Sequence, residues 1–192
     1  MLTATWGKHF FKADATKCAS EIMEICDQME SATPQQILEK ANVWEEIITS
    51  IHWYNGKPTD FSEKGLIDAL TNNAPCITAF GLLKCFCDAV VRNGVDTYST
   101  KFKAGVNIIA KGGLIPIKFA EHYIDEKLMS PKKGKPVLVH LNRFTGWSAE
   151  IELAYVDNIY SIEQIVNIIQ LAGFGCGIGS GRTSGYGRFH VE

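Results

Sequence analysis

The carboxy-terminal tail is the part of the sequence whose residue types and spacing could do chemistry. Seven of the 17 glycines lie between Gly173 and Gly187. A glycine inside a helix or strand costs about 0.5–1 kcal/mol, so this density indicates a specialised loop. Glycines let backbone N–H groups approach an anion, and Arg182 and Arg188 add charge and forked hydrogen-bond donors. The tail therefore predicts a phosphate-binding loop; the alternative is a connection that only lets the last strand pack closely on a helix.

Neither of the two common glycine-rich nucleotide-binding motifs fits this tail. A Walker A loop requires glycine at Cys176 and lysine at Arg182, and it leads from a strand into a helix, whereas here a helical pattern precedes the loop. No register between residues 173 and 187 satisfies G-x-G-x-x-G. These mismatches argue against ATP and dinucleotide binding, and we predict no cofactor.

Residues outside the two arginines are also candidates for contact with a polyanion. Tyr186 either stacks on a base or is a core aromatic. The basic segment 132–135 is either a phosphate-contacting hairpin or a solvated loop. Arg143 is a further candidate, beside a tight turn that we predict at Thr145-Gly146. The candidate nucleic-acid-binding residues are Gly177, Gly179, Ser180, Gly181, Arg182, Thr183, Gly185, Tyr186, Gly187, Arg188, Lys132, Lys133, Lys135 and Arg143.

Charge is distributed unevenly along a chain that is almost neutral overall. The 192 residues carry 19 basic and 21 acidic side chains, a net charge of −2. Residues 1–72 hold 11 acidic and 6 basic side chains, whereas residues 73–192 hold 10 acidic and 13 basic ones. The stretch 127–149 contains five Lys or Arg residues and no acid. A polyanion is therefore expected to bind the second part of the chain.

The histidines and cysteines form no metal-binding or redox motif. The five histidines show no metal-ligand spacing, and the six cysteines contain no C-x-x-C pair. We predict reduced, mostly buried thiols and no metal, and we assign no catalytic residue. His9 and His52 are the two histidines to test as general acid or base if the protein cleaves RNA.

Hydrophobic periodicity predicts the elements that must position the tail. Ser62 and Ser161 mark helix starts, and Gln164 completes a capping box with Ser161. The predicted helices are 14–29, 34–51, 62–70, 77–91 and 162–172, and the predicted strands are 2–11, 102–110, 114–119, 137–144, 147–155 and 186–191. The order β-α-β-β-α-β predicts an α+β, ferredoxin-like (RRM-like) antiparallel sheet with helices on one face and an early helical insertion.

Length and composition favour one domain spanning residues 1–192, with residues 13–72 as an acidic helical insertion within it. The hydrophobic content of 46% is enough for a core without disulfides or metal. No apolar run approaches the roughly 18 residues that cross a bilayer. The first 11 residues lack the build of a signal peptide. We therefore expect a cytoplasmic protein that does not associate with membranes.

The tail resembles the glycine-rich loop of the RAMP superfamily, the RNA-binding, RRM-like proteins of CRISPR effector complexes. Gly177-Ile178-Gly179, five residues that include Arg182, and Gly185-Tyr186-Gly187 have the spacing of that loop. Gly185-Tyr186-Gly187-Arg188 is most similar to the backbone subunits that polymerise along guide RNA. Residues 80–191 also resemble phage-encoded, CRISPR-backbone-like proteins, through Arg143-Phe144, Trp147, Ala172-Gly173 and Gly187-Arg188-Phe189. Residues 13–72 match no family pattern.

The resemblance implies a non-catalytic protein that binds RNA, or single-stranded DNA, through the phosphate backbone. It implies assembly along the strand, as a homo-oligomer or within a CRISPR-like complex, in the host cytoplasm if the protein is phage-encoded. Two other functions stay open. One is a metal-independent endoribonuclease of the same superfamily. The other is a protein-interaction module that mimics or caps a CRISPR complex, because the acidic region 14–70 suits a basic partner.

Overall fold

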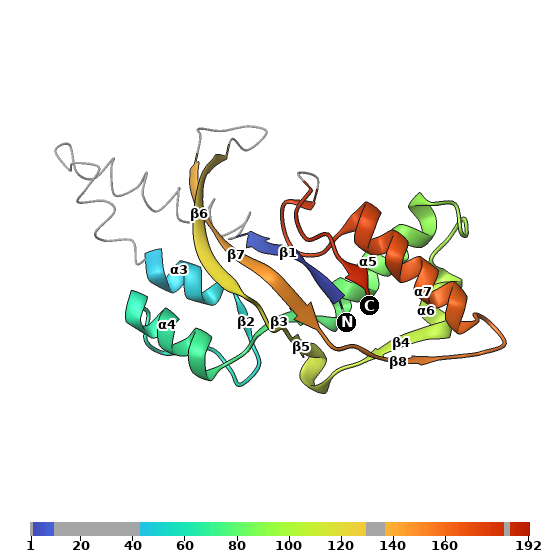
Figure 1. Ribbon diagram of the computed structural model, residues 1–192, viewed down its shortest axis with the longest axis horizontal. Coiled ribbons are helices and arrows are strands. Elements are labelled where there is room, and N and C mark those ends of the chain that lie inside the picture. The colour runs from blue at the N-terminus through green and yellow to red at the C-terminus, as the bar shows by residue number, and fades with distance from the viewer. Residues whose placement is uncertain (1, 10–42, 130–136, 183–184) are drawn as a thin grey trace, which may run out of the picture.

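The structure, a computed structural model, describes residues 2–9, 43–129, 137–182 and 185–192 (Figure 1). Its largest sheet has four strands in the spatial order β6-β7-β1-β9, and all neighbours are antiparallel. These strands are β1 (Leu2–His9), β6 (Glu121–Met129), β7 (Val137–Ala149) and β9 (His190–Val191). A three-stranded sheet contains β2 (His52–Trp53), β3 (Pro75–Thr78) and β5 (Leu114–Pro116), and a two-stranded sheet contains β4 (Val106–Ile109) and β8 (Glu152–Tyr155).

Helices occur together with antiparallel sheets in this chain, so the predicted α+β class is confirmed. The helices are α3 (Val43–Thr49), α4 (Glu63–Asn72), α5 (Ala79–Arg92), α6 (Thr100–Gly105) and α7 (Ile162–Leu171). A 3₁₀ turn, Lys111–Gly113, precedes β5, and a π-helical turn, Ala172–Cys176, follows α7 directly. Helix α5 packs against α7 and against this π-helical turn (Figure 1). Within the described residues, no helix is long and apolar enough to span a membrane.

Two predicted helix starts are confirmed by the caps that the structure shows. The Ser62 hydroxyl accepts a hydrogen bond from the Gly65 N–H at 3.0 Å at the start of α4. At the start of α7 the Ser161 hydroxyl accepts from the Gln164 N–H at 3.3 Å, and the Gln164 side-chain oxygen accepts from the Ser161 N–H at 2.9 Å. Because a cap involves residues within one turn of each other, the local sequence is enough to predict it.

The predicted strand 102–110 is wrong in its first half, where α6 is found instead. Phe102 of α6 is fully buried, and its ring meets the rings of Phe86 and Tyr160 edge-on at centroid distances of 6.5 and 5.6 Å. These aromatic contacts come from α5 and from the segment before α7, so tertiary packing outweighs the local strand propensity. The strand starts only at Val106.

The predicted turn at Thr145-Gly146 is also wrong, because β7 continues through it as one strand. On β1, Ala4 pairs with Trp147 and Trp6 pairs with Phe144, so β7 holds one extra residue in this interval. This is a β-bulge, and Gly146 has the positive φ of +56° that such a bulge accommodates. The bulge keeps Phe144 and Trp147 both buried.

The two ends of the tail also differ from the prediction. The last helix does not stop at Gly173, because the π-helical turn carries the helical path on to Cys176. The last strand is short: it contains His190 and Val191, which pair with Thr3 and Leu2 of β1. Residues 177–182 and 185–188 therefore lie in a connection whose two ends are fixed.

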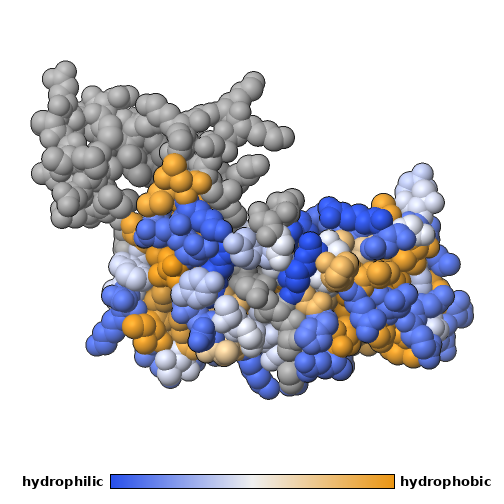
Figure 2. All heavy atoms as spheres, turned by 45° about the horizontal axis from the view of Figure 1, so that its top comes forward, coloured by the Kyte–Doolittle hydropathy of each residue, from blue (hydrophilic) through white to orange (hydrophobic). Residues whose placement is uncertain are grey.

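Strands β6 and β7 form a long ribbon with nine register pairs, from Glu121–Thr145 to Met129–Val137. Strand β1 pairs with β7 only as far as Leu141, so the end of the ribbon extends beyond β1. The cross-strand pair Leu128 and Leu138 near this end is exposed. Figure 2 shows the corresponding hydrophobic group at the end of the ribbon.

One continuous apolar cluster joins the helical region 43–72 to the sheet and to the tail. It includes Ile47 of α3, Leu66 of α4, Phe86 of α5, Trp147 of β7 and Phe189. The predicted helix 14–29 and the first part of the predicted helix 34–51 lie outside the described residues. The described part of the acidic region therefore shares the core of the remaining chain.

Asn142 on β7 fixes α3 to one face of the ribbon. Its side-chain nitrogen donates to the Ile47 oxygen at 2.9 Å and to the Ser50 hydroxyl at 2.7 Å. Its side-chain oxygen lies 2.8 Å from Nε2 of His122 on β6. Asn142 is fully buried, and an unsatisfied buried amide would cost about 1–3 kcal/mol, so these contacts hold α3 in a defined position.

Candidate nucleic-acid interface

The glycine loop, residues 177–188, connects the π-helical turn to β9. Its two limbs pair with each other at two levels. The Ile178 N–H donates to the Gly187 oxygen at 2.9 Å, and the Tyr186 N–H donates to the Gly181 oxygen at 3.4 Å. A Cβ on Gly187 would lie 1.8 Å from the Ile178 oxygen, and φ there is +71°. Glycine is therefore required where the limbs cross, and the loop has a rigid base.

The backbone N–H groups of the glycine loop divide into a paired set and an open set. The paired groups, which donate to carbonyls within the fold, belong to Gly177, Ile178, Gly185, Tyr186 and Phe189. The open set is formed by residues 179–181, three consecutive residues whose N–H groups donate to no acceptor within the described part of the chain; the N–H groups of Arg182, Gly187 and Arg188 have none there either. Successive N–H groups that are free of internal partners are the donors of anion-binding loops. The open set is thus the part of the loop able to bind a phosphate.

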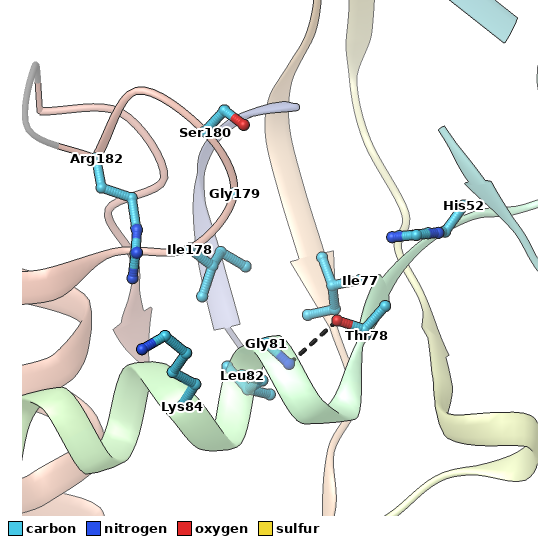
Figure 3. Close-up of a pocket in the computed structure, with 10 residues that line it drawn as sticks. All are labelled: His52, Ile77, Thr78, Gly81, Leu82, Lys84, Ile178, Gly179, Ser180 and Arg182. Carbon is cyan, nitrogen blue, oxygen red and sulfur yellow. Dashed lines mark hydrogen bonds between the residues drawn. The ribbon is translucent and has the colours of Figure 1, made fainter. Parts of the chain in front are cut away.

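A pocket of about 240 Å³ lies between this open set, the start of α5 and β2 (Figure 3). Figure 3 shows Lys84 and Arg182 on one side of the pocket and His52 on the opposite side. The ten residues that line it are His52, Ile77, Thr78, Gly81, Leu82, Lys84, Ile178, Gly179, Ser180 and Arg182. None of the ten is acidic.

The start of α5 adds further positive potential to this pocket. The Thr78 hydroxyl caps the helix by accepting from the Gly81 N–H at 3.1 Å (Figure 3). The aligned peptide dipoles of a helix place about half a positive charge at its N-terminus. Helix α5 is 14 residues long and has no acid in its first turn. The pocket therefore combines a helix N-terminus, two cationic side chains and the open N–H groups of the loop.

Both cations of the pocket have the same acidic neighbour, Asp88 on α5. The Asp88 carboxylate lies 3.5 Å from NH1 of Arg182 and 3.8 Å from Nζ of Lys84. Arg182 and Lys84 keep side-chain exposures of 38% and 57%. The ion pair with Asp88 links the glycine loop to α5, while both cations remain accessible from the pocket.

Tyr186 fastens the other side of the glycine loop to the sheet. The Arg143 guanidinium lies 3.4 Å from the centre of the Tyr186 ring, and Lys127 donates to the Tyr186 hydroxyl at 2.8 Å. A Cβ on Gly181 would lie 2.8 Å from a Tyr186 ring carbon, so the loop backbone also closes on the ring. Tyr186 was predicted either to stack on a base or to belong to the core. The structure shows its ring packed between Arg143 and Gly181.

The protonation states of Tyr186 and Lys127 reflect this contact. The hydrogen bond from Lys127, followed by the charge of Arg143, lowers the pKa of Tyr186 from its ordinary value of 10.0. The same hydrogen bond is the largest cause that raises the pKa of Lys127 above 10.5. Both shifts indicate that the Lys127 ammonium interacts with the Tyr186 oxygen.

Arg143 is placed under Tyr186 and is only 1% exposed. Its Nε and NH2 groups both donate to Oδ2 of Asp125, at 3.1 and 2.8 Å. In the ribbon Arg143 pairs with Tyr123, and Asp125 is two residues further along β6, so the two side chains are diagonal neighbours on one face. Arg143 therefore supports the glycine loop from within the fold, and its donors face Asp125.

The Asp125 carboxyl belongs to this cluster, and the neighbouring cations change its pKa. Partial burial raises its pKa, but the hydrogen bonds from Arg143 and the charge of Lys127 outweigh that effect. The pKa of Asp125 therefore lies below its ordinary value of 3.8. The carboxylate is ionised at neutral pH and holds two cations against the loop.

The remaining predicted site residues are placed as follows. Arg188 donates to the Phe174 oxygen of the π-helical turn and is partly buried. Ser180 lines the pocket. Thr183 and the three lysines of the predicted hairpin, Lys132, Lys133 and Lys135, lie outside the described residues. The structure therefore brings Gly179, Ser180 and Arg182 together at the pocket and places Arg143 and Tyr186 behind it.

Sequence reasoning missed Lys84, Asp88 and the start of α5 as parts of the site. The signal for the helix start was present, because Thr78 precedes Gly81 by three residues as a capping residue does. Nothing local indicated that this helix start would lie beside residues 178–182. His52, which we considered only as a general acid or base, lines the same pocket.

The cysteines are confirmed as free, buried thiols where the structure describes them, at Cys76, Cys85, Cys87 and Cys176. Burial raises the pKa of Cys85 to about 12, and its Sγ lies 3.0 Å from the Gly177 oxygen at the base of the loop. Cys18 and Cys26 lie outside the described residues. Among the described residues, no group of three or more His, Cys, Asp or Glu side chains is arranged to hold a metal ion.

Comparison with known proteins gives no significant match to a family model, to a curated protein or to a solved structure. The function is therefore inferred from the geometry of the glycine loop and its pocket.

Proposed function

We propose that the chain is a non-catalytic protein that binds single-stranded nucleic acid, RNA first and single-stranded DNA second, through its phosphates. The single observation that carries this proposal is the open edge of the glycine loop. The open N–H groups of Gly179 and Ser180 lie at one pocket together with Arg182, Lys84 and the start of α5, and no acid lines that pocket. Backbone donors, cations and a helix N-terminus are the groups that bind phosphate esters without reading a base.

The strand order supports the further proposal of a ferredoxin-like, RRM-like sheet. Strands β1 and β6 have β7 between them, and the long segment that connects them includes α5 along with other helices and short strands. Strands β7 and β9 have β1 between them, and the segment that connects them contains β8 and α7. Two such split βαβ units are what the ferredoxin-like arrangement requires. On this basis we retain the resemblance to the RAMP superfamily, and with it assembly along the nucleic acid in the cytoplasm.

The proposal assigns different roles to the predicted site residues. Gly179, Ser180, Gly181 and Arg182 contact the phosphates, together with Lys84. Tyr186 and Arg143 hold the loop in shape. Lys132, Lys133, Lys135 and Thr183 remain proposed phosphate contacts.

Fluorescence anisotropy with labelled oligouridine and oligodeoxythymidine tests this proposal. Wild type is expected to bind both, with an affinity that falls as salt rises from about 50 to 200 mM. Arg182→Ala is expected to weaken binding to all sequences alike and to reduce the salt slope by about one. Lys111→Ala, which removes a charge from an exposed turn outside the pocket, is the matched control and should bind like wild type. No binding at low salt, or equal binding by Arg182→Ala and wild type, would overturn the proposal.

His52 favours one second candidate, a metal-independent endoribonuclease. His52 lines the same pocket as the open N–H groups, and a histidine beside the RNA backbone can accept the proton of a 2′-hydroxyl (Figure 3). Incubation of a mixed RNA pool in EDTA discriminates the two functions. RNA that stays intact removes the nuclease, whereas cleavage that His52→Ala abolishes would replace the first proposal.

A further inference from the structure

Asp88 is an acidic residue beside a pocket whose lining contains two cationic side chains, Lys84 and Arg182, and no acid. It lies one turn after Lys84 on α5, and its two carboxylate oxygens face different cations. Oδ1 is 3.8 Å from Nζ of Lys84, and Oδ2 is 3.5 Å from NH1 of Arg182. Its side chain is 27% exposed, and it does not itself line the pocket. Asp88 therefore occupies the position of a counter-ion to both cations.

The lengths of these ion pairs show that Asp88 makes no short hydrogen bond to either cation. Charge-assisted hydrogen bonds between nitrogen and carboxylate oxygen measure about 2.7–2.9 Å. Both Asp88 pairs are longer than that, so they rest on charge attraction without short hydrogen bonds. A ligand phosphate can approach Arg182 and Lys84 through the pocket, and it then competes with Asp88 for the same charges.

We propose that Asp88 is a built-in competitor that makes the pocket select a phosphate polymer over small anions. This inference rests on the proposed function and names how the site discriminates among its ligands. Asp88 is attached to the same helix as Lys84, so its effective concentration at the two cations is in the millimolar range or above. A free anion must exceed that concentration to displace it.

A nucleic-acid strand overcomes this competition because its phosphates are linked. One phosphate can engage Arg182 while the neighbouring backbone engages the open N–H groups of residues 179–181. The second contact is then intramolecular and needs no further loss of translational freedom. Inorganic phosphate and mononucleotides have one set of contacts only, so Asp88 excludes them more strongly than it excludes a strand.

The test compares Asp88→Asn with Asp157→Asn. Both variants remove one negative charge from the full chain, and Asp157 lies in the exposed connection between β8 and α7. At low salt, Asp88→Asn is expected to bind labelled oligouridine about three- to tenfold more tightly than wild type, with a salt slope steeper by up to about one. Asp157→Asn should bind like wild type. Equal binding would show that Asp88 does not compete with the ligand, and weaker binding would show that Asp88 orients Arg182 for it; either result would overturn the inference.

Competition by inorganic phosphate provides the second measurement. The quantity compared is the phosphate concentration that displaces half of the oligouridine, corrected for the oligouridine affinity of each protein. This corrected concentration is expected to be lower for Asp88→Asn than for wild type. An unchanged value would overturn the proposed selectivity even if affinity rises. If wild type binds and Arg182→Ala weakens binding while Asp88→Asn has no effect, the proposed function stands and this inference fails. Absence of binding by wild type and Asp88→Asn alike overturns both.

Discussion

The glycine loop lies between two clusters that each contain an arginine, a lysine and an aspartate, and that differ in the burial of the arginine and in its distance to the carboxylate. In the first, Arg143 is 1% exposed and donates twice to Asp125, at 2.8 and 3.1 Å. In the second, Arg182 is 38% exposed and lies 3.5 Å from Asp88. The first cluster also includes the Tyr186 ring and Lys127, and the second borders the pocket.

The comparison shows that an arginine beside an anion-binding loop has one of two physical roles. A buried arginine whose donors are paired acts as a structural fastener, because removing its partner leaves an uncompensated charge in the fold. An exposed arginine in a long ion pair contributes little to stability, because solvent screens the pair, and its donors remain open to a ligand. The predictions below test this division of roles.

The largest expected effect is a difference in stability between two variants, Arg143→Ala and Arg182→Ala. Arg143→Ala should lower the free energy of unfolding by about 2–3 kcal/mol, because it removes a buried side chain that packs on Tyr186 and donates twice to Asp125. Arg182→Ala should lower it by less than about 1 kcal/mol. Urea denaturation followed by circular dichroism measures both values. Similar losses for the two variants would show that burial does not divide the clusters as we describe.

A comparable contrast is expected within the glycine loop, between its crossing point and its outer turn. Gly187→Ala should destabilise the protein by about 2–3 kcal/mol, because its Cβ would meet the Ile178 oxygen at 1.8 Å at a φ of +71°. Gly185→Ala, with φ of +84° and open space around the Cβ, should cost only about 1 kcal/mol. Thermal or urea unfolding of the two variants gives the comparison, and a larger loss for Gly185→Ala would contradict the described crossing.

Tyr186→Phe should have a smaller effect, because it removes only the hydroxyl of the fastener. The ring remains on Arg143, and the lost hydrogen bond from Lys127 is worth about 0.5–1.5 kcal/mol. Hydrogen exchange of the Ile178 amide, which donates to the Gly187 oxygen at the base of the loop, should rise slightly in Tyr186→Phe and strongly in Tyr186→Ala. Equal exchange in both variants would show that the hydroxyl, and not the ring, holds the loop.

The smallest effect concerns the pH dependence of the buried cluster. The pKa of Asp125 is lower in the folded protein than in the unfolded chain, so its stabilisation is present above the unfolded value, about 3.9, and is lost as the pH falls through the folded value. Wild type should therefore lose unfolding free energy on acidification below about pH 4. In Asp125→Asn this loss of unfolding free energy at acidic pH should be absent. If the variant shows the same pH dependence as wild type, Asp125 does not cause the loss.

The local features of the fold were predictable, and those that depend on tertiary contact were not. Ser62 and Ser161 each cap a helix through contacts within one turn, so the local sequence indicates both helix starts, and the glycines of the tail indicate a loop. Phe102 and Gly146 were assigned wrongly because contacts with residues distant in the sequence, Tyr160 for Phe102 and β1 for Gly146, decide whether a helix or a bulge forms.

The candidate site was predictable only in part, for the same reason. The sequence shows Arg143 and Arg182 as equivalent cations near glycines. The difference between their roles depends on Asp125, which lies across the β6–β7 ribbon from Arg143, and on Asp88, which lies on a helix nearly 100 residues before Arg182. Lys84 and the start of α5 lie at the site because of tertiary packing, which no residue spacing in the sequence indicates.

The attachment of α3 to the ribbon determines the position of a proton. The Ile47 oxygen only accepts, so the Asn142 nitrogen must face it, and the Asn142 oxygen must then face His122. That oxygen carries no hydrogen, so neutral His122 is the tautomer protonated at Nε2, with its lone pair at Nδ1. Burial lowers the pKa of His122 below 6.5, although the hydrogen bond to Asn142 opposes this, and the ring therefore favours its neutral form. A main-chain carbonyl on α3 thus selects one imidazole tautomer on β6, a state that ¹⁵N chemical shifts report directly.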